Sequence, residues 1–153
     1  MIRGIDHLNI VVADLGSSLR FYTELLGFRQ TKEAWLEGEW IERIVGLTGV
    51  RARAVFIVPP GGEPRIELLH YTAPVGLSLP ENSRANTLGL RHFALRVDDI
   101  HAVVAKLTAA GVEVWGEPTQ VPGGVVQFDT GNTKRLVYLL DPDGVIVELA
   151  EYR

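Results

Sequence analysis

Apolar and polar residues alternate along two short stretches of the chain that nearly repeat each other. Residues 4–15 read GIDHLNIVVADL, and residues 89–100 read GLRHFALRVDDI. Alternation with a period of two is typical of a strand with one buried face. After each stretch the apolar residues recur at helical spacing until a glycine, Gly27 in the first half and Gly111 in the second, where a helix would end. The chain is therefore predicted to consist of two related halves.

Further strand-like segments follow each predicted helix, separated by turns rich in Pro, Gly and Asp. They read FRQTKEA, RARAVFIV and RIELLHY in the first half, and VEVWGEP, VVQFDT, TKRLVYLL and VIVELAEY in the second. We therefore predict an α+β fold in which two tandem βαβββ modules form a curved, barrel-like sheet with helices outside. The predicted single domain spans 1–153, with module 1 at 1–71, a linker at 72–87 and module 2 at 88–153.

Each half places a histidine and a glutamate on the more polar face of its strands. His7 corresponds to His92 with an offset of 92 − 7 = 85, and Glu67 corresponds to Glu148 with an offset of 148 − 67 = 81. Side chains alternate across a strand, so the apolar neighbours of all four residues face the helix. The four residues would then line a concave surface, where a ligand site is expected.

A lone strand histidine is usually a hydrogen-bonded core residue, and a lone strand glutamate usually faces solvent. Four such residues at repeat-equivalent positions need another explanation, because a buried carboxylate is costly without a cation or strong donors. A divalent metal bound by two imidazoles and two carboxylates would satisfy all four. His70 is close to Glu67 in sequence but falls on the opposite face of the strand. The second half has Glu151 at the equivalent position, and we exclude His70 from the site.

Other segments have open interpretations. In the insert 33–50, Trp40, Ile44 and Leu47 would share a helical face, which is compatible with a pocket wall, a lid or a simple packing helix. The glycine-rich segment 121–135 could flank the site. Candidate substrate-binding residues are Asn9, Trp40, Arg43 and Arg96. Basic residues that could meet an anionic substrate, or could simply be solvated, are Arg43, Arg51, Arg53, Lys134 and Arg135. For helix N-caps the sequence offers Asp14 and either Asp98 or Asp99.

Composition narrows the function classes. The net charge is −4, so no basic field invites nucleic acid or acidic lipid. The chain has no cysteine, which excludes disulfides and thiolate chemistry. No apolar run approaches the roughly 20 residues that span a bilayer, and the start lacks the features of a signal peptide. We therefore expect a cytoplasmic protein that binds neither nucleic acid nor membrane.

The motifs together resemble the vicinal oxygen chelate superfamily, which includes glyoxalase I, methylmalonyl-CoA epimerase, extradiol dioxygenases and fosfomycin- and bleomycin-resistance proteins. The resemblance covers essentially the whole chain. It rests on DHLNIVVADL with FYTELLGF, RIELLHY, LRHFALRVDD and LLDPDGVIVELAE. It implies that His7, Glu67, His92 and Glu148 hold one divalent ion per site, with Ni, Co, Zn, Mn and Fe all open.

Four ligands make the chain most similar to glyoxalase I and the epimerases. The resemblance then implies a metal-dependent lyase, isomerase or epimerase that transfers a proton next to a carbonyl through a metal-stabilised enediolate or enolate. Glu148 and Glu67 would carry the proton, with Glu148 favoured as the base, and the small-molecule substrate would present vicinal oxygens. An Fe(II) extradiol-type dioxygenase and a non-catalytic drug-binding resistance protein are the alternatives. The resemblance also implies a homodimer, and leaves open whether a site lies within one chain or across a dimer interface.

Overall fold

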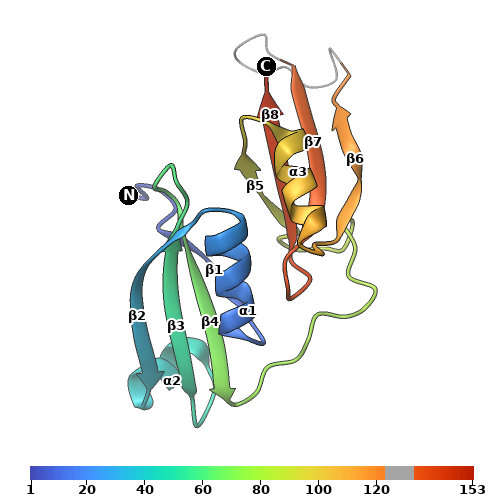
Figure 1. Ribbon diagram of the computed structural model, residues 1–153. Coiled ribbons are helices and arrows are strands. Elements are labelled where there is room, and N and C mark those ends of the chain that lie inside the picture. Colours follow the sequence, from blue (N-terminus) through green and yellow to red (C-terminus); the bar gives the residue numbers. More distant parts are fainter. Residues whose placement is uncertain (123–132) are drawn as a thin grey trace. The chain divides into compact units, whose positions relative to one another are not determined.

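The computed structural model describes residues 1–122 and 133–153, and the chain divides into two compact units, Met1–Ser78 and Leu79–Arg153 (Figure 1). The division falls inside the segment predicted as the linker. The predicted strand VVQFDT, and most of the glycine-rich segment 121–135, lie outside the described residues.

The first unit contains a four-stranded sheet in the order β1-β4-β3-β2. Its strands β1 and β4 are parallel, and the other neighbours are antiparallel. The elements are β1 His7–Val11, α1 Leu15–Leu19, a π-helical continuation η1 Arg20–Leu25, β2 Arg29–Glu37, α2 Glu39–Val45, β3 Arg51–Val58 and β4 Arg65–Ala73.

The second unit repeats this arrangement in the order β5-β8-β7-β6, again with its first and last strands parallel. Its elements are β5 His92–Arg96, α3 Ile100–Ala109, β6 Val114–Gln120, β7 Lys134–Leu140 and β8 Ile146–Tyr152. Each sheet is curved and is not closed into a barrel of its own. The predicted α+β class with two tandem βαβββ modules is therefore confirmed.

Both module helices begin at an aspartate that caps them. The Asp14 carboxylate accepts a hydrogen bond from the Ser17 backbone N–H at 2.7 Å, and the Asp99 carboxylate accepts one from Ala102 at 3.0 Å. Such caps satisfy backbone donors that the first helical turn leaves unpaired. Of the two candidates in the second half, Asp99 is the cap.

The core of each unit lies between its sheet and its module helix. Buried residues on this side include Ile10, Phe21, Tyr22, Ile66 and Leu68 in the first unit, and Ile100, Leu107, Val147 and Leu149 in the second. On the strands these residues alternate with the predicted site residues, so the opposite face of each sheet, called here the mixed face, is left for other contacts.

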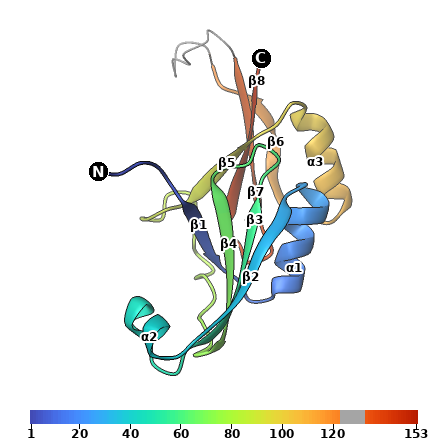
Figure 2. The same cartoon turned by 90° about the vertical axis from the view of Figure 1, so that its left-hand side faces the viewer.

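Helix α2 is an addition to the repeat and packs on the mixed face of the first sheet. Ile41 is only 6% exposed and forms a cluster with Val50, Ala52, Ala54 and Leu69. Figure 2 shows α2 and α1 on opposite sides of this sheet. Helix α2 therefore packs on this sheet through Ile41.

The predicted helical face of α2 is not the packed one. Trp40, Ile44 and Leu47 are 54%, 71% and 42% exposed. The insert contains two overlapping apolar registers, and the neighbouring small residues Ala52 and Ala54 accommodate the one that contains Ile41. Residues 33–37 of the insert extend β2 instead of joining the helix.

No helix in the described ranges is long and apolar enough to cross a membrane.

Candidate functional site

Parallel pairing of the first and last strands brings a histidine beside a glutamate in each module. Asn9 pairs with Glu67 and Ala94 pairs with Glu148, and the histidine lies two residues before the paired residue in both cases. Neighbouring strands are about 4.8 Å apart, and side chains two residues apart share a face. The repeat in the sequence thus becomes a repeat in the geometry.

In the first module the His7 and Glu67 side chains face each other. His7 Nε2 lies 3.6 Å from Glu67 Oε2, and the Asn9 amide donates to the same oxygen at 2.8 Å. On the other side of the ring, His7 Nδ1 lies 2.7 Å from the Asp6 carboxylate, which also pairs with Arg65. The hydrogen bond from His7, followed by that from Arg65, lowers the pKa of Asp6.

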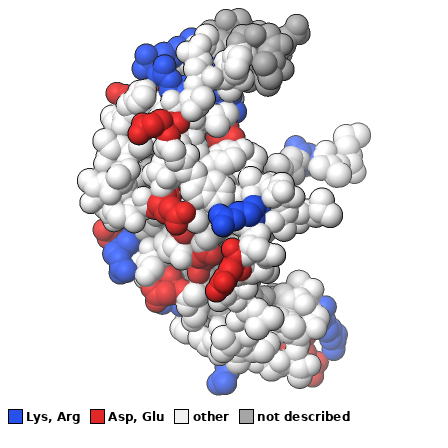
Figure 3. Space-filling model, turned by 90° about the vertical axis from the view of Figure 1, so that its right-hand side faces the viewer, with Lys and Arg blue, Asp and Glu red and all other residues white. Residues whose placement is uncertain are grey.

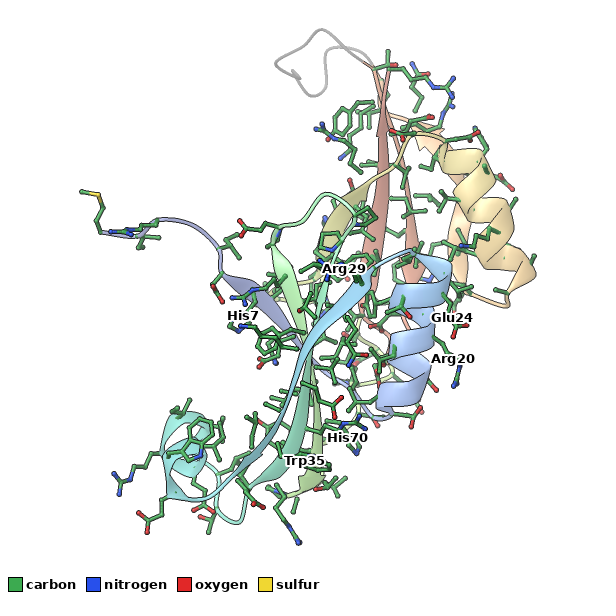
Figure 4. All side chains as sticks on the ribbon, turned by 60° about the vertical axis from the view of Figure 1, so that its left-hand side comes forward. His7, Arg20, Glu24, Arg29, Trp35 and His70 are labelled. Atoms are coloured by element: carbon green, nitrogen blue, oxygen red, sulfur yellow. The ribbon has the colours of Figure 1, made fainter. Side chains whose placement is uncertain are left out.

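The ionised Asp6 carboxylate can only accept, so His7 donates from Nδ1 and a neutral ring keeps the Nε2 lone pair free. That lone pair points toward Glu67 Oε2, and two acceptors at this distance gain from a cation between them. A carboxylate that orients the far nitrogen of a histidine is also the usual arrangement around metal-bound histidines. Figure 4 shows His7 on the side of the sheet away from α1.

In the second module the corresponding atoms, His92 Nε2 and Glu148 Oε2, are 3.4 Å apart. The Glu148 side chain is 6% exposed, and its other oxygen, Oε1, accepts from Lys134 Nζ at 2.5 Å. Burial is the largest single effect and acts to lower the pKa of Lys134, but the hydrogen bond to Glu148 and the charge of Glu148, with smaller contributions from Tyr152, together outweigh it and the pKa is raised. The Tyr138 ring lies 5.0 Å from the His92 ring, and burial, with the charge of Glu148, raises the pKa of Tyr138.

These donors fit a divalent transition metal in kind, because imidazole nitrogen and carboxylate oxygen suit Zn, Ni, Co, Mn and Fe. The structure brings His7 together with Glu67 and His92 together with Glu148. Among the residues that the structure describes, no cluster holds three or more His, Cys, Asp or Glu side chains placed for one ion. Each module therefore offers two of the four expected donors.

The histidine excluded on sequence grounds has a structural partner. His70 Nδ1 lies 3.1 Å from the Val12 carbonyl oxygen, and Figure 4 places His70 on the α1 side of the sheet. Its repeat counterpart Glu151 is buried on the equivalent face of the second sheet, where it pairs with Arg135 and Arg153. Neither residue reaches the mixed face.

The predicted substrate-binding residues have different surroundings. Asn9 donates a hydrogen bond to Glu67. Trp40 and Arg43 lie on α2, where Arg43 forms an exposed ion pair with Glu39 at 3.1 Å. Arg96 lies on the mixed face of the second sheet with its guanidinium 4.8 Å from the centre of the Tyr152 ring.

Two other basic residues, Arg53 and Arg135, pair with carboxylates that do not belong to the His–Glu pairs. Arg53 pairs with Glu33 at 2.7 Å and Arg135 with Glu151 at 3.5 Å. On the face drawn in Figure 3, acidic and basic side chains are scattered and form no broad basic patch. This distribution agrees with the net charge of −4.

Sequence reasoning missed two contacts that hold the His–Glu pairs. Asp6 precedes His7 directly, which was a usable signal, because such a neighbour can bond the ring. The contact between Lys134 and Glu148 is harder to predict from the sequence, because it depends on the strand register. In that register Tyr138 pairs with Glu148, and Lys134 pairs with Tyr152. That register then puts all four side chains on one face.

The second unit also contains an open hollow of about 510 Å³, lined by Arg84, Ala85, Asn86, Glu113 and Trp115. Trp115 pairs with Tyr138 across the sheet, and their rings are 6.4 Å apart. The hollow thus borders the row of mixed-face side chains that contains Tyr138.

Comparison with known proteins places the chain among glyoxalase-type proteins. The profile of the Glyoxalase/Bleomycin resistance protein/Dioxygenase superfamily matches residues 4–149. A 2-epi-5-epi-valiolone epimerase from Actinomyces sp is 30% identical over 149 residues, covering 95% of this chain and 77% of the relative. A probable lactoylglutathione lyase from Vibrio cholerae is 28% identical over 96% of this chain and 89% of its own.

Solved structures agree with this placement. A glyoxalase family protein from Bacillus cereus superposes with a TM-score of 0.83 at 32% identity, covering 99% of this chain and 95% of the other. The glyoxalase I of Leishmania major superposes with a TM-score of 0.64 at 22% identity, covering 98% and 87%, and shares the fold.

Proposed function

The chain belongs to the Glyoxalase/Bleomycin resistance protein/Dioxygenase superfamily, and on that premise we propose that it is a divalent-metal-dependent lyase or isomerase that moves a proton next to a carbonyl group. One observation carries the proposal. In both modules a histidine Nε2 faces a glutamate Oε2, at 3.6 Å in the first and 3.4 Å in the second. The superfamily relatives include an epimerase and a probable lactoylglutathione lyase, whose names describe these two reaction types.

The proposed metal ligands are His7, Glu67, His92 and Glu148. Their support is the chemistry of the two donor pairs, the repeat that relates them, and the Asp6 contact that leaves His7 Nε2 as an acceptor. A bound divalent ion would supply Lewis-acid polarisation of the substrate oxygens beside it.

Proton transfer is assigned to the two glutamates, which take the proton from the carbon next to the carbonyl and return it there or to the neighbouring carbon. A carboxylate bound to the ion is a poor base, so a glutamate in this role would release the ion when the substrate binds. Glu148 is favoured for it by family resemblance. Asn9 donates to Glu67 and so keeps that carboxylate directed toward His7.

The rest of the substrate would contact the mixed face of the second sheet. The Arg96 guanidinium, stacked over Tyr152, is suited to an anionic group. The hollow beside Trp115 offers an aromatic surface for a larger substituent. Trp40 and Arg43 remain candidates from the sequence, with no contact that links them to the His–Glu pairs.

The test combines metal content with proton exchange. Metal analysis of untagged protein should find a divalent ion. Incubation in heavy water with hydroxy-ketones, thiol adducts of 2-oxoaldehydes or acyl-CoA thioesters should then show metal-dependent exchange of the α-proton of one of these classes. Glu148→Gln should abolish exchange, whereas Glu117→Gln, an exposed glutamate on β6, should not.

Undiminished exchange in Glu148→Gln would remove Glu148 from the role of base. A protein that neither contains nor responds to a divalent ion would end the ligand assignment. Oxygen uptake with a catechol would instead support the dioxygenase alternative, and ligand binding by metal-free protein without turnover would support the drug-binding one. The expected homodimer is checked by sedimentation.

A further inference from the structure

The two glutamates of the repeat are held by different groups. Glu67 Oε2 accepts from the neutral Asn9 amide, and this is the same oxygen that faces His7. Glu148 is held through its other oxygen: Oε1 binds the Lys134 ammonium while Oε2 faces His92. Lys134 thus leaves Oε2 directed toward the histidine.

The contact arises from the strand register of the second module. Tyr138 pairs with Glu148, and Lys134, four residues earlier on β7, pairs with Tyr152. Residues two and four apart on a strand share a face, so Lys134 lies on the mixed face with Glu148. Its side chain is 16% exposed, and its Nζ lies 5.7 Å from the centre of the Tyr152 ring. The lysine is therefore confined between Tyr152 and Glu148.

The first module has a different residue at the equivalent place. Phe56 pairs with Glu67 there, and Ala52, four residues earlier, pairs with Tyr71. Ala52 is fully buried in the cluster formed with Ile41 of α2. In the first module this position is an alanine that packs against the inserted helix α2. In the second module it is Lys134, whose ammonium group binds Glu148.

We propose that Lys134 is a positioning residue that holds Glu148 by one oxygen and presents the other to the metal. The inference rests on the proposed function. Its physical reasons are that a carboxylate with 6% exposure needs a compensating charge, and that groups which fix a ligand from behind raise its affinity for the metal. Without Lys134, Glu148 loses both its counter-charge and the contact that sets its orientation.

The experiment measures binding of Co²⁺ to the full-length chain by titration calorimetry and by the visible absorption of the bound ion, neither of which depends on turnover. Lys134→Met, which keeps the stem and removes the ammonium, should weaken Co²⁺ binding about tenfold to a hundredfold and change the absorption bands. Lys134→Arg should restore much of the affinity, because it returns a cation to Glu148 Oε1.

A matched control is Arg135→Met. Arg135 is the next residue on β7 and also pairs with a carboxylate of β8, Glu151, but on the opposite face. Its loss should leave Co²⁺ affinity and absorption unchanged. If Lys134→Met does not fold, Lys134→Gln, which retains a donor without the charge, should show a smaller loss of affinity.

Equal affinity in wild type and Lys134→Met would overturn the inference. Tighter binding in Lys134→Met would also overturn it, because Lys134 would then compete with the ion for Glu148. A wild-type protein that binds no divalent ion would overturn the proposed function and this inference with it. That result differs from failure of the inference alone, in which the wild type binds the ion and Lys134→Met binds it at least as well.

Discussion

At the scale of single residues, Asp6 decides which nitrogen of His7 is available. Its carboxylate holds Nδ1 at 2.7 Å and is itself held by Arg65. Asp6→Asn retains the size of the side chain, but its amide can also offer donors to the ring, so the tautomer with a free Nε2 is no longer enforced.

We expect Asp6→Asn to weaken divalent metal binding about tenfold to a hundredfold, measured by calorimetric titration. Asp98→Asn, at an exposed aspartate next to the cap of α3, is the control and should bind as the wild type does. Unaltered affinity in Asp6→Asn would mean that the Asp6–His7 contact does not orient a metal ligand.

At the scale of elements, α2 is stabilised by one side chain that inserts into the mixed face. Ile41→Ala should lower the free energy of unfolding by about 2–5 kcal/mol, because it leaves a cavity among Val50, Ala52 and Leu69. Ile44 lies on the same helix and is 71% exposed, so Ile44→Ala should change the free energy of unfolding by no more than about 0.5 kcal/mol. Denaturant unfolding monitors both, and equal effects would contradict the packing described for α2.

The cap of α1 gives a pH-dependent prediction. Hydrogen bonds from the Ser17 side chain and backbone lower the pKa of Asp14 below its usual 3.8. A lowered pKa in the folded state means that the contribution to stability is present above that usual value and is lost as the pH falls through the lowered one. Asp14→Ala should therefore reduce Tm near neutral pH, and the difference from the wild type should close in strong acid.

Thermal melts across this range test the prediction, with Asp98→Ala as the control that should follow the wild type throughout. A Tm difference for Asp14→Ala that persists in strong acid would show that the ionised cap is not its source.

At the scale of the whole molecule, the proposed ligands come from both modules. Each module supplies one histidine to the proposed ligand set, so His7→Ala and His92→Ala should each weaken divalent metal binding. His101→Ala, whose ring contacts Arg135 at the start of β7, should retain it. Equilibrium dialysis with metal analysis gives the number of ions per chain. Variants that each retain half of the wild-type ions would indicate two independent sites.

The sequence predicted the modules and the strand faces because these follow from a period of two and from an internal repeat. It grouped His7, Glu67, His92 and Glu148 as one ligand set, and did not predict that His7 would lie beside Glu67 and His92 beside Glu148. It could not select between the two apolar registers of the insert, since the choice depends on Ala52 and Ala54 on another strand. It could not find the Lys134 contact either, because that contact crosses strands and depends on the conformation of a long side chain.

Because the first and last strands of each module pair directly, the distance between the histidine and the glutamate does not depend on how many residues lie between them in the chain. His7 and Glu67 are 67 − 7 = 60 residues apart, and His92 and Glu148 are 148 − 92 = 56 apart, yet both pairs have the same register. The intervening segments can thus gain or lose residues while the donors stay in place, and α2 is such a gain. An insertion in these segments can therefore change the surroundings of a His–Glu pair without moving the pair itself.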